Sequence, residues 1–193
     1  MNIIPVGRDA LLAEVSSPQD AVALAAWARE RGLARDVVPG AETVLFDGVA
    51  DPDGLADTLA AWRRAGTMLG PRVEIPVTYD GPDLETVGGH WGCNVEEVVT
   101  RHRGTEFVSA FCGFAPGFAY LSGLDASVPR LATPRTRVPR GSVALAGTWC
   151  GVYPVASPGG WQIIGHTDAE LWDPRRGEPA LLAPGTRVRF VSR

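Results

Sequence analysis

Residues 106–118, EFVSAFCGFAPGF, join an apolar strand, Glu106–Cys112, to a turn rich in glycine and proline, Gly113–Phe118. Short apolar stretches and Gly/Pro turns also follow one another in the rest of the chain. The further strands predicted there are Ser142–Ala146, Gly151–Tyr153, Trp161–Ile164 and Arg187–Val191. Short strands separated by Gly/Pro turns are typical of a small β-barrel or sandwich.

Two short helices are predicted just before this strand-rich part, at Asp83–Trp91 and Asn94–Arg103. The second begins with a variant of the capping box, because Asn94 is followed three residues later by Glu97. The strand-rich part and these helices together form the C-terminal domain that we predict.

The first 78 residues alternate strands with helices. The predicted strands are 10–15, 35–38, 42–46 and 72–78. The predicted helices are 19–31, after the N-cap Ser17 and the first helical residue Pro18, and 52 to about Ala65, opened by Asp51-Pro52. This order, β-α-β-β-α-β, is the split βαβ arrangement of ferredoxin-like domains. We therefore predict an α+β protein, with a ferredoxin-like domain at residues 1–78 and a β-barrel domain at residues 79–193. The first domain contains no catalytic cluster and is interpreted as a packing or docking module.

Composition excludes several functions. The chain has 193 residues, of which 45% are hydrophobic, so it can bury a core, and its net charge of −4 predicts no attraction to nucleic acid or to an anionic membrane. All 18 basic residues are arginine. The absence of lysine excludes a phosphate-loop lysine and a Schiff-base lysine in this chain. Any anion must be held by arginine, by backbone N–H groups or by a partner chain.

The three cysteines and the N-terminus indicate a cytoplasmic protein. Cys93, Cys112 and Cys150 have neither the spacing of a zinc site nor that of a redox pair. The first residues, MNIIPVGRD, lack the features of a signal peptide, and no apolar stretch is long enough to span a membrane.

A segment rich in arginine and proline is the first candidate site. Arg130, Arg135, Arg137 and Arg140 lie within Pro129–Arg140, and three of them follow a proline directly. Proline restricts the backbone, so the segment presents guanidinium groups that suit a carboxylate or phosphate. The alternative is a solvated loop whose arginines pair with Asp80, Asp83, Glu85, Glu96 and Glu97.

Two turns and one histidine complete the candidates. Glycines in Gly113–Phe118 can direct N–H groups at a ligand while nearby aromatic rings line a pocket, and Ser157–Trp161 is a similar tight turn with a bulky anchor. His102 lies between Arg101 and Arg103, whose positive charge should favour its neutral form, which could act as a base. For each of these features, a purely structural role is the alternative.

The motifs, taken in order, resemble the family of 5-oxoprolinase B subunits, also called allophanate hydrolase subunit 1 or the KipI family. The resemblance covers residues from about 8 to 191 and rests on these segments: Ile75–Tyr79, Gly81–Leu84, His102, Gly113–Leu121, Pro134-Arg135, Val138–Val143, Gly151–Pro154 and Ser157–Trp161.

This resemblance implies an α/β domain followed by a cyclophilin-like β-barrel. It implies a non-autonomous component of an enzyme that works with two further 5-oxoprolinase subunits, the cyclophilin-like C subunit and the A subunit, to open 5-oxoproline to glutamate at the expense of ATP. Arginines, partner residues or Mg²⁺ would neutralise the phosphates. The positions carried over place three catalytic candidates, His102, Arg135 and Arg140, beside the substrate-binding candidates Phe114, Pro116, Gly117, Phe118, Gly159, Gly160 and Trp161.

The sequence departs from the family pattern at three places. Trp149-Cys150 stands where the family usually has Gln-Thr, His166 replaces an arginine, and Thr78 replaces a cysteine. Loss of the glutamine removes a polar side chain that would face the pocket. Two alternatives therefore stay open: a regulatory protein that inhibits a sensor histidine kinase, and a component of a urea-amidolyase-type hydrolase acting on allophanate.

Overall fold

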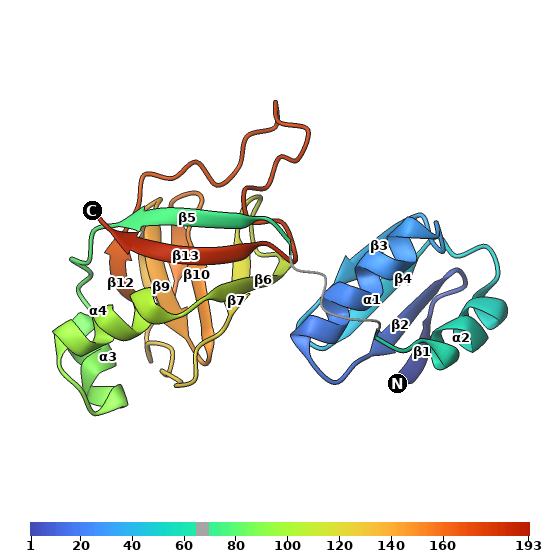
Figure 1. Cartoon of the computed structure of the whole chain (residues 1–193), viewed down its shortest axis with the longest axis horizontal. Helices are drawn as coiled ribbons and strands as arrows, with labels where there is room; N and C mark the ends of the chain where they lie inside the picture. Colours follow the sequence, from blue (N-terminus) through green and yellow to red (C-terminus); the bar gives the residue numbers. More distant parts are fainter. Residues whose placement is uncertain (65–69) are drawn as a thin grey trace. The chain divides into compact units, whose positions relative to one another are not determined.

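The computed structural model describes residues 1–64 and 70–193 (Figure 1). The chain divides into two compact units, Met1–Leu69 and Gly70–Arg193. The first is a small α/β domain and the second is built on a nearly closed seven-stranded sheet. The predicted α+β class, a small α/β domain followed by a β-barrel, is confirmed.

The first unit is a four-stranded antiparallel sheet with two helices. Its elements are β1 (Asn2–Val6), β2 (Ala10–Glu14), α1 (Pro18–Glu30), β3 (Asp36–Pro39), β4 (Thr43–Asp47) and α2 (Pro52–Ala61), with the strand order β1-β2-β4-β3. Each helix begins as predicted, with Pro at a first position and a side-chain cap: Ser17 accepts from the Asp20 amide, and Asp51 accepts from that of Gly54. The helices bury Leu24 and Leu59 against Phe46 of the sheet.

The predicted strand order of this unit was wrong at both ends. β1 occupies one edge of the sheet, and the expected last strand, β5 (Arg72–Val77), lies in the barrel beside β13 (Arg187–Ser192). The boundary therefore precedes β5 instead of following residue 78. Alternation of Val73, Ile75 and Val77 specifies a strand with one buried face, but it does not specify which sheet supplies the partner. The predicted helix end at Ala65 lies outside the described residues.

The second unit contains the barrel. Its sheet consists of β5, β6 (Phe107–Cys112), β7 (Ala119–Ser122), β9 (Ser142–Ala146), β10 (Trp149–Val152), β12 (Gln162–His166) and β13, in the order β12-β9-β10-β7-β6-β13-β5. The two outer strands meet at Thr78 and His166, whose backbones exchange two hydrogen bonds of 2.9 Å. Gly165 permits this closure, because a Cβ atom there would collide with the Thr78 carbonyl.

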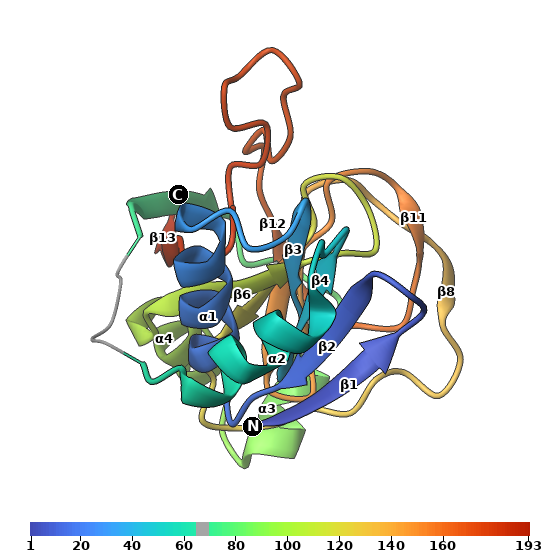
Figure 2. The ribbon, with the colours of Figure 1, turned by 90° about the vertical axis from the view of Figure 1, so that its right-hand side faces the viewer.

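Two helices and a small accessory sheet surround the barrel. α3 (Leu84–Trp91) contacts β12, and α4 (Val95–Gly104) contacts β13. The expected capping box opens α4, since Asn94 and Glu97 exchange side-chain-to-backbone hydrogen bonds of 2.9 Å. β8 (Arg135–Val138) and β11 (Ser157–Gly159) pair as a separate two-stranded sheet (Figure 2). In the described residues we find no helix with the length and apolar character needed to cross a membrane.

The barrel sheet is apolar on both faces. Along β10, Cys150 and Val152 belong to a core cluster that also includes Val98 of α4, whereas Gly151 faces a second cluster around Phe118 and Trp161. Adjacent strand residues point to opposite faces of a sheet. Side chains that contact Cys150 are therefore separated from those that contact Gly151 by the sheet itself.

Candidate functional site

An aromatic cluster forms the centre of the candidate site. The ring of Phe118 lies edge-on to four others, with centroid distances of 5.2 Å to Tyr120, 5.3 Å to Phe114, 5.5 Å to Tyr153 and 5.5 Å to Trp161. Such pairs contribute about 0.5–1.5 kcal/mol each beyond their buried area. The cluster draws on the 113–118 turn, on β7, on the residue after β10 and on the residue before β12, so it joins segments that are distant in sequence.

Gly151 lets this cluster close against the sheet. A Cβ atom at this position would lie 2.9 Å from Cζ of Phe118 and 3.1 Å from Cζ3 of Trp161. The glycine is required because of close packing and not because of a left-handed backbone. The sheet face beneath the two rings is therefore flat.

Phe114 is presented in an unusual way. Its φ of 68° makes it the one non-glycine residue with positive φ among the described residues, and 62% of its surface is exposed. Hydrogen bonds hold the turn in this shape, from the Ala115 amide to the Gly113 carbonyl (2.8 Å) and from the Phe118 amide to the Ala115 carbonyl (2.9 Å). Holding a bulky residue in the left-handed backbone conformation costs on the order of 1–3 kcal/mol. The surrounding contacts therefore hold the Phe114 backbone in a strained conformation that leaves its ring exposed.

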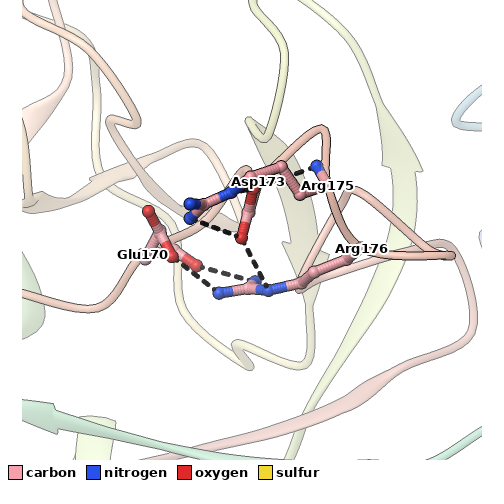
Figure 3. A network of polar contacts seen from close by, with 4 residues as sticks. All are labelled: Glu170, Asp173, Arg175 and Arg176. Carbon is pink, nitrogen blue, oxygen red and sulfur yellow. Dashed lines mark hydrogen bonds and ion pairs between the residues drawn. The ribbon is translucent and has the colours of Figure 1, made fainter.

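A loop between β12 and β13 lies against the same turn. Trp172 packs so close to Gly117 that a Cβ atom on this glycine would lie 2.9 Å from the Trp172 Cβ. Beside Trp172, Asp173 is paired with Arg175 (2.9 Å) and lies 3.8 Å from Arg176, which also pairs with Glu170 (2.9 Å; Figure 3). Hydrogen bonds from Arg175 lower the pKa of Asp173. This network orders the loop that carries Trp172.

Arg135 is the arginine that the structure places beside the aromatic cluster. Its Nη2 atom lies 2.8 Å from a carboxylate oxygen of Asp83, and its Nη1 donates to the Trp161 carbonyl at 3.4 Å. The alternative in which the arginines pair with acids is thus confirmed for Arg135 and Asp83. By contrast, the exposed side chains of Arg130, Arg137 and Arg140 have no ion-pair partner among the described residues.

His102 lies on the other face of the sheet. It is completely buried, with Nδ1 2.8 Å from the Tyr79 hydroxyl and Nε2 3.4 Å from Cys150 Sγ. The rings of Phe107 and Phe190 enclose it at centroid distances of 5.1 and 4.6 Å. Burial lowers the pKa of His102 to about 3, so the imidazole is neutral. The neutral form was predicted, but its cause is desolvation and not the neighbouring arginines.

The structure assembles the predicted site only in part. Phe114, Pro116, Gly117 and Phe118 share the 113–118 turn beside Trp161, and Gly159 lies against the Tyr153 hydroxyl. Gly160 lies against Pro134, next to Arg135. His102 is not brought to this cluster, and Arg140 contributes no contact to it; its charge acts instead on Asp168.

Tyr153, whose ring contacts that of Phe118, is a member of the site that was not predicted as a site residue. Tyr153 is buried, which raises its pKa, while the positive charges of Arg130 and Arg135 act in the opposite direction. Its place in the segment Gly151–Pro154 was the available signal in the sequence. The described residues contain no group of three or more His, Cys, Asp or Glu side chains able to hold a metal ion.

Comparison with known proteins identifies the family. Residues 1–182 match the model of the carboxyltransferase domain, subdomain C and D. A protein named as the B subunit of 5-oxoprolinase, from Escherichia coli O157:H7, is 41% identical, over 96% of this chain and 93% of its own length. The chain belongs to the family of 5-oxoprolinase B subunits. A second relative of that name, from Haemophilus influenzae, is 35% identical over 99% of this chain and 97% of its own.

Solved structures of other proteins share the fold of this chain. The protein TTHA0988 superimposes with a TM-score of 0.78 at 35% identity, and the match covers 95% of this chain but only 39% of that one. A conserved uncharacterized protein from Pyrococcus horikoshii, PH0987, has a TM-score of 0.61 at 31% identity, covering 100% and 97% of the two chains. The Kluyveromyces lactis urea amidolyase shares the fold, with a TM-score of 0.72 at 16% identity.

The three departures from the family pattern have structural roles. Trp149 packs edge-on against Phe111 at 5.4 Å, and Cys150 fills the core beside His102. The Nδ1 atom of His166 donates a hydrogen bond of 2.8 Å to the Asp80 carboxylate, while the backbone of His166 closes the barrel on Thr78. Trp149, Cys150 and His166 each have a side-chain neighbour, whereas Thr78 takes part through its backbone.

Proposed function

We propose that this chain is a non-autonomous subunit of an ATP-dependent 5-oxoprolinase and that it acts with the C and A subunits of that enzyme. The observation that carries the proposal is the 41% identity, across nearly the whole length of both chains, to a protein named as the B subunit of 5-oxoprolinase. The match to TTHA0988 supports a non-autonomous role, because the greater part of that longer chain lies outside the match. In the net reaction, 5-oxoproline, ATP and two waters give glutamate, ADP and phosphate.

The chemistry of the site is consistent with this substrate. A lactam ring is nearly flat and has an apolar CH2–CH2 edge, which suits the exposed ring of Phe114, backed by the buried rings of Phe118 and Trp161. A carboxylate suits a guanidinium group such as that of Arg135, which borders the same cluster. Opening the ring adds water across the C–N bond, so the carbon gains the hydroxyl and the nitrogen gains a proton.

The phosphates of ATP require positive charge, and this chain can supply it only from arginine. Arg137 and Arg140 fit that role, since both are exposed and have no ion-pair partner in the described part of the chain. We infer that they contribute to phosphate binding at the interface with one of the other subunits. The nucleotide would supply the driving force for opening an unstrained lactam.

Reconstitution tests the proposal. The chain is purified alone, with the C subunit, and with both the C and A subunits, and ATP consumption and glutamate release are measured with and without 5-oxoproline. We expect little ATPase from the chain alone and a stable complex with the C subunit. ATP consumption that depends on 5-oxoproline, with glutamate release, should follow once the A subunit is added. A complete set that releases no glutamate would reject the proposal.

A further inference from the structure

Asp83 is a buried carboxylate that joins three parts of the barrel domain. It directly precedes α3, and only 6% of its surface is exposed. Its Oδ2 accepts from the Ile163 amide of β12 at 2.6 Å, and its Oδ1 accepts from Nη2 of Arg135, in β8, at 2.8 Å. The backbone N–H of Asp83 also donates to the Ile163 carbonyl at 3.1 Å. A single residue therefore ties α3, β8 and β12 together.

This arrangement orients Arg135. A buried carboxylate is tolerated when it is paired and hydrogen-bonded, so Asp83 requires both of its donors. The second hydrogen bond from Arg135, to the Trp161 carbonyl, fixes the plane of the guanidinium at the edge of the aromatic cluster. The exposed fraction of the Arg135 side chain is 28%, which leaves part of this side chain accessible to a ligand.

We propose that Asp83 is a positioning residue: its carboxylate holds Arg135 beside Trp161, so that the remaining guanidinium N–H groups face a carboxylate-bearing ligand at the aromatic cluster. The ligand part of this inference rests on the proposed function. Asp83 itself contacts the Ile163 amide and Arg135, and it acts on the ligand through Arg135. Removing it would leave the arginine present but free to leave Trp161.

The structural half of the proposal is tested without any activity. Hydrogen exchange at the Ile163 amide is measured in the wild type, in Asp83→Ala and in the milder Asp83→Asn. The control is Asp125→Ala, which removes an exposed aspartate–arginine pair of similar length, with Arg101 at 2.7 Å. We expect exchange at Ile163 at least tenfold faster in Asp83→Ala and unchanged in the control. If Asp83→Ala does not fold, a faster exchange in Asp83→Asn supports the proposal. Unchanged exchange in the folded Asp83 variants overturns it.

The functional half uses the reconstituted complex. Asp83→Asn is expected to raise the KM for 5-oxoproline at least tenfold with less than a twofold change in the KM for ATP. The double variant of Asp83→Asn with Arg135→Ala should have a KM for 5-oxoproline no higher than that of Arg135→Ala alone. The reason is that the two changes disable the same Asp83–Arg135 pair. Equal changes in both KM values, or effects that multiply, would overturn the positioning role. A wild-type complex without activity would reject the proposed function, and exchange at Ile163 would still decide whether Asp83 ties α3 to β12.

Discussion

The Nε2 atom of His102 lies 3.4 Å from the Sγ atom of Cys150, inside a core that excludes water from both residues. The Tyr79 hydroxyl satisfies the other ring nitrogen at 2.8 Å. Burial also raises the pKa values of Tyr79 and Cys150, so all three groups remain neutral. The network connects α4, β10 and the segment after β5, and it has consequences for stability.

Stability should fall with acidification because of His102. Its pKa is about 3 in the folded state against an ordinary value of 6.5, so below pH 6.5 the unfolded chain binds a proton that the folded chain does not. The free energy of unfolding should therefore decrease as the pH falls from 6.5 towards 3, by up to about 5 kcal/mol. Urea unfolding at a series of pH values measures this slope.

The matched variants are His102→Leu and His90→Gln. His102→Leu should flatten the pH dependence between 6.5 and 3, although it lowers stability at neutral pH by leaving Tyr79 without its partner. His90 is exposed at the end of α3, so His90→Gln should keep the wild-type slope. A slope that survives in His102→Leu would contradict the assignment to this residue.

Gly151→Ala should destabilise the protein. The new methyl group would press on Phe118 and Trp161, and overpacking of this kind costs about 1–3 kcal/mol. Gly89→Ala is the control, because it lies in α3 with no atom within 4 Å of an added Cβ. There the helix should gain about 0.5–1 kcal/mol. Equal urea midpoints for the two variants would show that the aromatic cluster can accommodate the added methyl group.

The variant Phe114→Gly should be more stable than the variant Phe114→Ala. Alanine keeps the strained positive φ and loses the ring, whereas glycine releases about 1–2 kcal/mol of strain at this position. Phe111, within β6, is the control, because its φ is not positive. There the variant Phe111→Ala should be more stable than Phe111→Gly, since glycine weakens a strand. Thermal unfolding of the four variants compares them, and the same ranking at both positions would argue against strain at Phe114.

Arg140→Ala should affect turnover without affecting stability. The side chain is exposed and has no ion-pair partner among the described residues, so the melting temperature should change little. If it binds phosphate, the KM for ATP in the reconstituted complex should rise at least tenfold, and salt should weaken ATP binding to the wild type. Arg31→Ala, an exposed position after α1, is the control. An unchanged KM for ATP in Arg140→Ala would exclude this residue from phosphate binding.

Local signals predicted most of the helices and strands. The caps at Ser17, Asp51 and Asn94 marked three helix starts, and Ser142–Ala146 was predicted with both ends correct. Four strands were missed: β1, β7, β8 and β11. β7 follows the Gly/Pro turn directly, with no residue between them to mark its start. β8 contains two arginines and β11 contains proline and glycine, and both are short, so their apolar periodicity is weak.

The candidate site was predicted less completely, because its members are joined by the topology. Phe118 and Trp161 belong to motifs visible in the sequence, but their contact depends on the missing side chain of Gly151 between them. His102 was grouped with them because of the family resemblance, and the alternation of β10 places it on the opposite face.

Amino-acid order alone determined the two-part α+β class, the helix caps, the absence of lysine and the family. These depend on neighbouring residues or on the order of motifs, which are readable along the chain. The assignment of β5 to the barrel, the burial of His102 and the pairing of Arg135 with Asp83 were decided only by the tertiary structure. Each is a contact between distant segments, and a strand or a charge carries no local mark of the partner it will meet.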